Sequence, residues 1–283
     1  MVARTPFHER LSELNDQHLY THWQGHLSAL RYSHAPKHEY VAVRHSVGVF
    51  DTSPLNKIRV TGPDAERFLS GVLVRDVSGL REGRAAYTLW CDDRGFVMED
   101  GVLFRHGLDE LTLTSARPAL AWLTAHRGTL EVDLEDMTED YGILAVQGPR
   151  SAQVLGSLTP AVADLPWFGV VTTTIAGAEV TLSRTGFTGD LGYELNVPRR
   201  HCLDVLDVLD AVLAAGRDHQ LRPFGMGARP GWRCRTARSS RHRSLCQRST
   251  PGAPSPSSST RGSCPTTSST PCAGRSTAGS PPK

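Results

Sequence analysis

The sequence lacks any run of apolar residues long enough to cross a membrane, and no apolar stretch follows its first residue. A membrane-spanning helix needs roughly 20 apolar residues, and a secretory signal needs a shorter apolar core near its start. Met1 is followed instead by polar, histidine-rich and charged residues. We therefore expect a cytoplasmic protein with no membrane partner.

Cysteine is too sparse to indicate a disulfide framework. The 283 residues include six cysteines. Cys91 and Cys202 lie far apart in the sequence, and the other four are scattered through residues 229–283. This spacing fits neither a stapled secreted domain nor a metal-binding motif, and it agrees with a reducing cytoplasm.

Acidic residues are absent from the last part of the chain. Residues 229–283 contain 10 Lys and Arg and no Asp or Glu, whereas residues 1–228 contain 21 basic and 29 acidic residues. The basic pI therefore comes from the tail and does not indicate that the body binds nucleic acid. The tail also lacks the interleaved aromatic residues typical of single-strand binders, so we expect no nucleic-acid partner.

The same tail has few large apolar residues. It contains eight prolines and 20 Ser and Thr, with Trp232 and Leu245 as its main bulky apolar side chains. Such a segment cannot bury enough apolar surface to fold. Its composition changes abruptly after Ala228, so we expect a low-complexity segment that is either disordered or the product of a shifted reading frame in GC-rich DNA.

The rest of the chain alternates between strand and helix patterns and predicts an α+β fold. Its 39% hydrophobic content suits a globular protein. We expect helices within 7–30 and 200–215, at 38–44 and 116–126, and in shorter pieces after 62 and around 152–155. We expect strands at 47–55, 58–60, 86–91, 96–105, 111–115, 130–134, 143–146, 172–175, 178–184 and 195–197.

Histidines in the first of these segments invite a metal interpretation. His18, His22 and His26 would share one face of a helix over residues 7–30. No acidic or cysteine residue keeps the same spacing, so a polar helix face is favoured over a metal site. We predict no metal in this protein.

The loop RTGFTGDLGYE at 184–194 interleaves three glycines with polar residues between two predicted strands. Glycine allows backbone to approach a ligand closely. Glu194 would begin the second strand and be held by regular structure. The pattern fits a recognition loop, and it fits equally well a hairpin turn with a surface glutamate.

A second candidate lies on a predicted hairpin whose turn is DDRG at 92–95. This turn would allow Tyr87 and Asp100 to face one another across the strands. Asp100 lies within an otherwise apolar strand. It is either a surface residue or a buried acid with a raised pKa of the kind used in proton transfer, and base rates favour the surface.

Five motifs then occur in a characteristic order: FDTSPL at 50–55, AYTL at 86–89, EDGVL at 99–103, QGP at 147–149, and the loop at 184–194. Together they resemble the aminomethyltransferase family, which includes the glycine cleavage T-protein and related tetrahydrofolate-dependent demethylases. The resemblance covers nearly all of residues 7–228.

The resemblance implies a folate-binding fold of three domains around a channel. Residues 1–50 with 140–228 would form the folate-binding α+β domain, and residues 51–139 an inserted second α+β domain. The third domain of the family is a C-terminal β-barrel, which residues 229–283 cannot build. We therefore expect that domain to be missing and the activity to be impaired.

The resemblance also implies roles for single residues. Asp100 matches the catalytic aspartate, although Glu99 replaces the acid that precedes it in the family. The implied cofactor-binding residues are Glu194, which would accept hydrogen bonds from the pterin, Tyr87, Phe187 in place of a tyrosine, Leu55 in place of a methionine, and Arg229.

The implied activity is a tetrahydrofolate-dependent aminomethyltransferase that moves a one-carbon unit from an amine or methyl donor to tetrahydrofolate. A lipoyl carrier protein is a further implied partner. Residues 23–32 lack the Gly-Trp-x-Met-Pro stretch of true T-proteins, so a relative that acts on another small amine or methyl donor is as strong an expectation as glycine cleavage itself. The alternative is a non-catalytic folate-binding or regulatory module.

Overall fold

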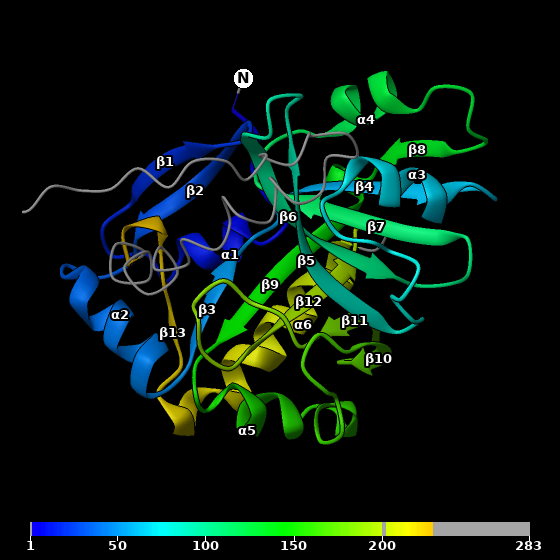
Figure 1. The fold of residues 1–283 in the computed structure, drawn as a ribbon. Helices are drawn as coiled ribbons and strands as arrows, with labels where there is room; N and C mark the ends of the chain where they lie inside the picture. The colour runs from blue at the N-terminus through cyan, green and yellow to red at the C-terminus, as the bar shows by residue number, and fades with distance from the viewer. Residues whose placement is uncertain (1, 200–201, 229–283) are drawn as a thin grey trace, which may run out of the picture. The chain divides into compact units, whose positions relative to one another are not determined.

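The computed structural model describes residues 2–199 and 202–228, and they contain a two-stranded hairpin and two larger sheets (Figure 1). The larger sheet has six strands in the order β10-β11-β12-β9-β3-β13. Neighbouring strands are antiparallel except for the short pair of β13 with β3. The strands are β3 (Gly48–Asp51), β9 (Tyr141–Gln147), β10 (Val170–Ile175), β11 (Ala178–Ser183), β12 (Gly192–Pro198) and β13 (Arg222–Pro223).

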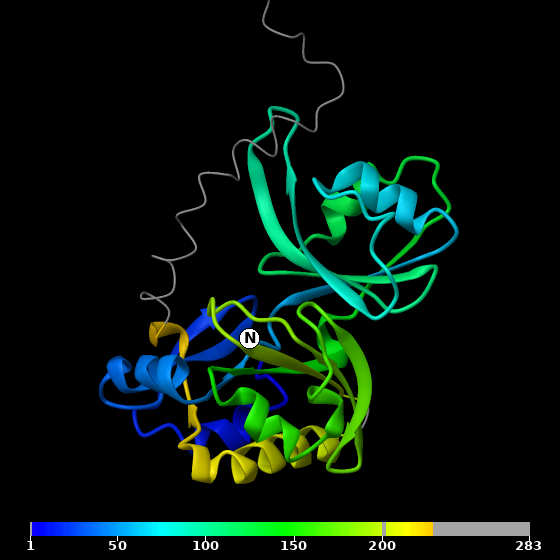
Figure 2. The same cartoon turned by 60° about the horizontal axis from the view of Figure 1, so that its bottom comes forward.

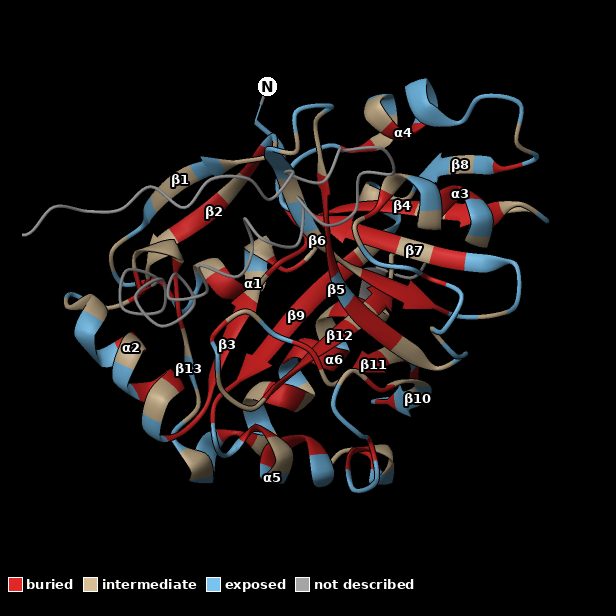
Figure 3. Cartoon of the chain, viewed as in Figure 1, coloured by how far each residue is buried: buried red, intermediate tan, exposed pale blue. Residues whose placement is uncertain are grey.

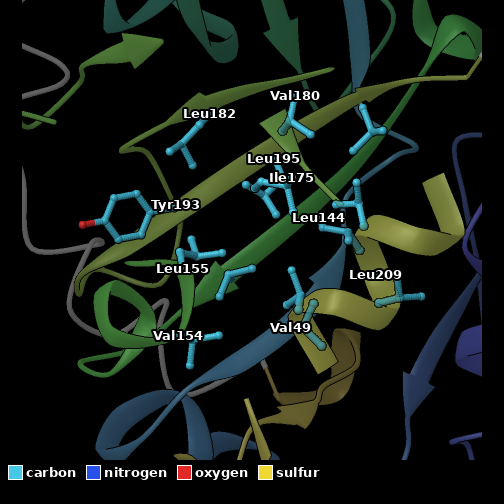
Figure 4. Close-up of a cluster of buried hydrophobic side chains, with 14 of the residues drawn as sticks. Val49, Leu144, Val154, Leu155, Ile175, Val180, Leu182, Tyr193, Leu195 and Leu209 are labelled. Carbon is cyan, nitrogen blue, oxygen red and sulfur yellow. The ribbon is translucent and has the colours of Figure 1, made fainter. Parts of the chain in front are cut away.

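Two helices, α5 (Ser151–Gly156) and α6 (Cys202–Ala215), cover one face of this sheet (Figure 2). Strands β9 and β12, in the middle of the sheet, are buried along most of their length (Figure 3). Side chains alternate along each strand, so every second residue points into the core beneath these helices. Figure 4 shows strand and helix residues meeting there. The labelled members are Val49, Leu144, Val154, Leu155, Ile175, Val180, Leu182, Tyr193, Leu195 and Leu209.

The second sheet is antiparallel and has the order β5-β6-β7-β4-β8. Helices α3 (Ala65–Val72) and α4 (Leu120–His126) contribute Phe68, Leu69 and Leu123 to its buried core. The strands are β4 (Asn56–Thr61), β5 (Arg84–Cys91), β6 (Val97–Arg105), β7 (Glu110–Ser115) and β8 (Asp133–Asp136). The predicted hairpin with its turn at 92–95 is confirmed.

The prediction of a histidine-bearing helix within residues 7–30 is wrong beyond Ser12. Helix α1 covers only His8–Ser12, and an antiparallel hairpin of β1 (Leu19–Trp23) and β2 (His26–Arg31) follows. Its two-residue turn holds Gln24 and Gly25 at φ of 46° and 81°, the left-handed conformation that such hairpins require. The left-handed turn at Gln24 and Gly25 is therefore incompatible with a continuous helix through these residues.

The three histidines consequently do not share a helix face. His26 is buried, and its ring nitrogens contact the Gln24 carbonyl at 2.9 Å and a Glu139 carboxylate oxygen at 3.1 Å. No group of three or more His, Cys, Asp or Glu residues with metal-binding geometry occurs in the described part of the chain.

The remaining elements differ from expectation mainly at their ends. Helix α4 begins four residues later than predicted, because Pro118 restricts the residue before it. Strand β8 begins at Asp133, where its pairing with β4 starts. Also present are α2 (Pro36–His45) and 3-10 turns at Thr138–Asp140, Pro160–Val162, Arg217–His219 and Met226–Ala228. Among the described residues, no helix is long and apolar enough to span a membrane.

Candidate functional site

A row of register partners that includes Glu194 crosses the six-stranded sheet on the face opposite α5 and α6. Phe50 on β3 pairs with Ala145 on β9, Ala145 pairs with Glu194 on β12, and Glu194 pairs with Ser183 on β11. In β12, the residues on either side of Glu194, Tyr193 and Leu195, belong to the core beneath the helices. The alternation of the strand therefore places Glu194 on the opposite face.

Glu194 is 9% exposed and is held by a chain of hydroxyl groups. Thr185 Oγ1 donates to Glu194 Oε2 at 2.5 Å, and Ser183 Oγ lies 2.7 Å from Thr185 Oγ1. Burial raises the pKa of the Glu194 carboxyl, and the hydrogen bond from Thr185 opposes that rise. Glu194 Oε1 accepts no hydrogen bond from any described residue. The prediction that strand structure holds this carboxylate is confirmed.

Two glycines of the loop at 184–194 are explained by the side chain of Gln147. A Cβ on Gly186 or on Gly192 would lie 2.1 Å from Gln147 Oε1, so neither position has room for a larger residue. Gln147 Oε1 accepts from Thr188 Oγ1 at 3.0 Å, and Gln147 Nε2 donates to the Tyr193 carbonyl at 3.1 Å. The absence of a Cβ at these two glycines makes room for the buried amide of Gln147. The sequence suggested another role for the glycines, the close approach of backbone to a ligand.

Aromatic side chains on the same face as Glu194 form a cluster with Ala145, its register partner. Phe187 packs edge-on against Phe50, with ring centroids 5.7 Å apart. Phe50 also stacks against Phe224 at 5.1 Å and Trp23 at 6.0 Å. The loop thus places one aromatic ring and one carboxylate on the same side of the sheet.

Tyr87 and Asp100 form a separate pair on β5 and β6. Tyr87 Oη donates to Asp100 Oδ2 at 2.7 Å, so the predicted proximity is confirmed. Asp100 is exposed, which decides between the two interpretations in favour of the surface. The preceding Glu99 is less accessible than Asp100, and it pairs with Arg117 at 3.4 Å. Its partial burial raises the pKa of its carboxyl.

Of the other two predicted residues, Leu55 lies within the described part of the chain and Arg229 does not. Leu55 is half-buried in the turn between β3 and β4, and its amide donates to the Thr52 carbonyl at 3.0 Å. Arg229 lies outside the described residues, as does the predicted low-complexity tail. No hydrogen bond links Asp100 to Glu194 within the described chain, so the predicted site consists of two groups on two sheets.

Sequence reasoning missed a buried ionic group beside Leu55. Lys57 is 2% exposed, and its Nζ donates to the carbonyls of Ser53 and Leu55, both at 2.8 Å, and of Thr138 at 3.1 Å. Burial lowers the pKa of Lys57 to about 8, although the charge of Asp51 raises it in part. A lysine within the pattern NKIRV at 56–60 gave no signal of burial.

Two cavities in the described chain have linings that include neither Glu194 nor Asp100. One of about 320 Å³ is lined by α2 and by basic side chains that include His38, His45, Arg150 and Arg222. Another of about 110 Å³ is lined by residues of both sheets, among them Lys57, His106 and Asn196.

Comparisons with known proteins bear on this arrangement. The chain is 34% identical over 231 residues to an aminomethyltransferase of Saccharopolyspora erythraea, covering 80% of this chain and 61% of that protein. It is 40% identical over 195 residues to the Mycobacterium leprae aminomethyltransferase, covering 68% and 52%. The chain therefore spans only about half to three fifths of the length of these relatives.

A solved structure shares the fold. The glycine cleavage system aminomethyltransferase T from Bartonella henselae superposes with a TM-score of 0.71 over 82% of this chain and 62% of that one, at 23% sequence identity. The predicted α+β fold is confirmed by this likeness.

The family assignment rests on the extent of the sequence match. The model of the GCVT N-terminal domain matches residues 8–251, and it therefore continues beyond Ala228 into the basic segment. The resemblance predicted from the five sequence motifs is confirmed by this match and by the curated relatives. The chain belongs to the aminomethyltransferase family defined by the GCVT N-terminal domain.

Proposed function

We propose that this chain binds tetrahydrofolate, with Glu194 as the acceptor for the hydrogen-bond donors of the pterin ring. The observation that carries the proposal is the state of the Glu194 carboxylate. It is buried on the sheet face opposite α5 and α6, and Thr185 occupies Oε2 while Oε1 has no partner among the described residues. A buried carboxylate with an open oxygen is suited to a ligand that brings its own donors.

The chemistry of a pterin fits this position. Its ring N–H and amino group form an edge of adjacent donors, which one carboxylate can accept as charge-assisted hydrogen bonds. Phe187 and Phe50 supply apolar, aromatic surface on the same face of the sheet as the carboxylate. Tyr87 and Leu55 are further proposed contacts along the folate, and Arg229 is proposed only from the family pattern.

We further propose that the protein moves a one-carbon unit from a small amine or methyl donor to tetrahydrofolate. Tetrahydrofolate supplies the nucleophilic N5 nitrogen that receives the unit. Asp100 can orient the donor, stabilise developing positive charge or carry a proton, and the phenol of Tyr87 fixes the orientation of its carboxylate. A lipoyl carrier protein is the proposed macromolecular partner, by analogy with the glycine cleavage system.

The proposed domain division follows the two sheets. Residues 51–139 contain all of β4 to β8 and the core that they share with α3 and α4. Residues 1–50 and 140–228 contain Glu194 and the six-stranded sheet apart from Asp51, the last residue of β3. We propose that the first segment is a domain inserted into the second.

A non-catalytic folate-binding module is the second candidate, and one observation favours it. Asp100 is exposed and has no hydrogen bond to Glu194 within the described chain, so the proposed transfer group and the proposed binding group are held separately. The relatives named aminomethyltransferases extend well beyond the matched region, and parts of the transfer site can reside there.

Binding and transfer can be measured separately. Tetrahydrofolate affinity is measured by fluorescence titration, and transfer by the appearance of the one-carbon adduct of tetrahydrofolate. We expect Glu194→Gln to weaken binding at least tenfold, and Asp100→Asn to reduce transfer with little change in affinity. Unchanged affinity in Glu194→Gln would contradict the folate site, whereas binding without turnover in the wild type would support the module.

A further inference from the structure

The donor and acceptor of each hydrogen bond in the hydroxyl chain beside Glu194 follow from the number of protons that the groups carry. A hydroxyl carries one proton, and an ionised carboxylate can only accept. Thr185 therefore gives its proton to Glu194 Oε2, and Ser183 must be the donor to Thr185. The chain runs one way, from Ser183 through Thr185 to Glu194, as long as Glu194 is ionised.

We infer that Thr185, supported by Ser183, is a positioning residue that keeps Glu194 ionised and leaves Oε1 as the acceptor for a ring with adjacent N–H donors. The identity of that ligand rests on the proposed function, whereas the effect on Glu194 does not. Nothing in the sequence motif distinguishes Thr185 from the other polar residues of the loop; the geometry alone does.

The surroundings of Glu194 explain why a neutral hydroxyl can matter. No charged side chain contributes to the pKa of Glu194 among the described residues, so the Thr185 hydrogen bond is the one interaction that opposes the effect of burial. Arg44, a basic side chain near the loop, pairs with Asp190 instead. A hydrogen bond to the charged form of a buried acid favours that form.

The hydroxyl chain is also rigidly built. Ser183 is fully buried and Thr185 is 4% exposed, and strand pairing places Ser183 directly opposite Glu194. Buried side chains of this kind keep one rotamer, so Oε2 is held in place and the carboxylate plane is fixed. A ligand therefore meets a carboxylate that needs no reorientation.

The inference is tested by measuring the pH at which the Glu194 carboxyl ionises. Protein carrying ¹³C-labelled glutamate carboxyls is titrated by NMR, and the Glu194 signal is assigned by its loss in Glu194→Gln. Thr185→Val removes the hydroxyl and keeps the shape of the side chain. We expect the titration midpoint of Glu194 to rise by about one pH unit in this variant, the size of one lost hydrogen bond. Thr185→Ser retains the hydroxyl and should restore the wild-type midpoint.

A matched control exists in the same loop. Thr188 is also buried, but its hydroxyl bonds to Gln147 and not to Glu194. Thr188→Val should leave the Glu194 midpoint within about 0.3 unit of the wild type, since it removes no bond to the carboxylate. Ser183→Ala provides a second variant that should shift the midpoint upward by a smaller amount, should Thr185→Val fold poorly.

Affinity for tetrahydrofolate is then measured against pH. In Thr185→Val the affinity should fall relative to wild type near and below the raised midpoint, by up to about tenfold for a one-unit shift, and it should recover as the pH rises, because ionised Glu194 is restored. An unchanged Glu194 midpoint in Thr185→Val, or an equal shift in Thr188→Val, would overturn the inference. Wild-type protein that fails to bind tetrahydrofolate would instead contradict the proposed function, since the NMR midpoint decides the role of Thr185 separately.

Discussion

Tyr87 and Asp100 meet diagonally across the hairpin of β5 and β6, with Tyr87 Oη 2.7 Å from Asp100 Oδ2. They are not register partners, because Tyr87 pairs with Val102 and Asp100 pairs with Leu89. Diagonal neighbours on one face of a sheet are within reach of a long aromatic side chain. Partial burial and this hydrogen bond both raise the pKa of the Tyr87 phenol above its ordinary value.

Removing the charge of Asp100 should therefore lower the pKa of Tyr87. In Asp100→Asn the negative charge that opposes phenolate formation is gone, so Tyr87 should ionise at a lower pH than in the wild type. The measurement is phenolate absorbance during an alkaline titration, with Tyr87→Phe subtracted to isolate this phenol from the other tyrosines. An unchanged midpoint would show that Asp100 does not hold Tyr87 in solution.

Much of the fold was predictable because its signals were local. The DDRG turn at 92–95 and the apolar spacing of α6 predicted their elements closely. The hairpin of β1 and β2 was not predicted, because Gln24-Gly25 is a weaker turn signal than Asn-Gly. Histidines at spacings of four then favoured a helix that the turn prevents.

The candidate site was predictable in part, for a different reason. Glu194 and Tyr87 were candidates from the local sequence and gained roles from the family pattern, whereas Phe187 came from the family pattern alone. Thr185 was not identified, because nothing in the motif marks it among the polar residues of the loop, and Gln147 was not, because its hydrogen bond to Thr188 joins residues 41 positions apart. The close contact of Gly186 with Gln147 likewise cannot be seen in either local sequence.

Gly186→Ala should destabilise the protein by roughly 1–3 kcal/mol through overpacking. The new Cβ would lie 2.1 Å from Gln147 Oε1, and the buried Gln147 amide is held by hydrogen bonds with the Thr188 hydroxyl and the Tyr193 carbonyl. Combining Gly186→Ala with Gln147→Ala should remove most of that added cost, giving a clear coupling in a double-mutant cycle measured by urea unfolding.

Gly189→Ala is the control for this cycle. Gly189 has a φ of 77° and no neighbour within 4 Å of an added Cβ. Its substitution should cost about 1 kcal/mol through backbone strain, and Gln147→Ala should not relieve that cost. Equal coupling at both glycines would contradict the packing explanation.

Lys57 should make stability depend on pH above neutrality. Its pKa is about 8 in the folded protein, against an ordinary value of 10.5. Between these values the unfolded chain binds more protons than the folded one, so the contribution of Lys57 to stability rises with pH. Lys57→Met lacks that rise. The free energy of unfolding of the wild type should therefore increase relative to that of the variant by on the order of 1–2 kcal/mol from pH 7.5 to 9.5.

Urea unfolding at several pH values measures this difference. Taking the difference removes the contributions of tyrosines and of other groups common to both proteins. Lys37 provides the matched control, because it is exposed on α2, and Lys37→Met should show no growing difference. A constant difference for Lys57→Met over this range would mean that Lys57 keeps an ordinary pKa.

Glu39→Gln should loosen the segment Met226–Ala228 from the body of the protein. Glu39 is 1% exposed, and its Oε2 accepts from the Gly225 amide at 2.8 Å while Oε1 accepts from the amides of Tyr32 and Ser33 at 2.7 and 2.8 Å. A glutamine can keep the Oε1 contacts only by turning its amino group toward the Gly225 N–H, which leaves two donors facing each other.

The expected cost of Glu39→Gln is roughly 2–3 kcal/mol in the free energy of unfolding, because a buried amide loses a charge-assisted partner. Hydrogen exchange at the Gly225 amide should increase more than exchange within β9, since only the former loses its acceptor. Glu82→Gln, at an exposed position, should change stability by less than about 0.5 kcal/mol. If Gly225 stayed protected in Glu39→Gln, the segment would be held by the close packing of Gly225 and Gly227 on the Leu30 carbonyl and not by the carboxylate.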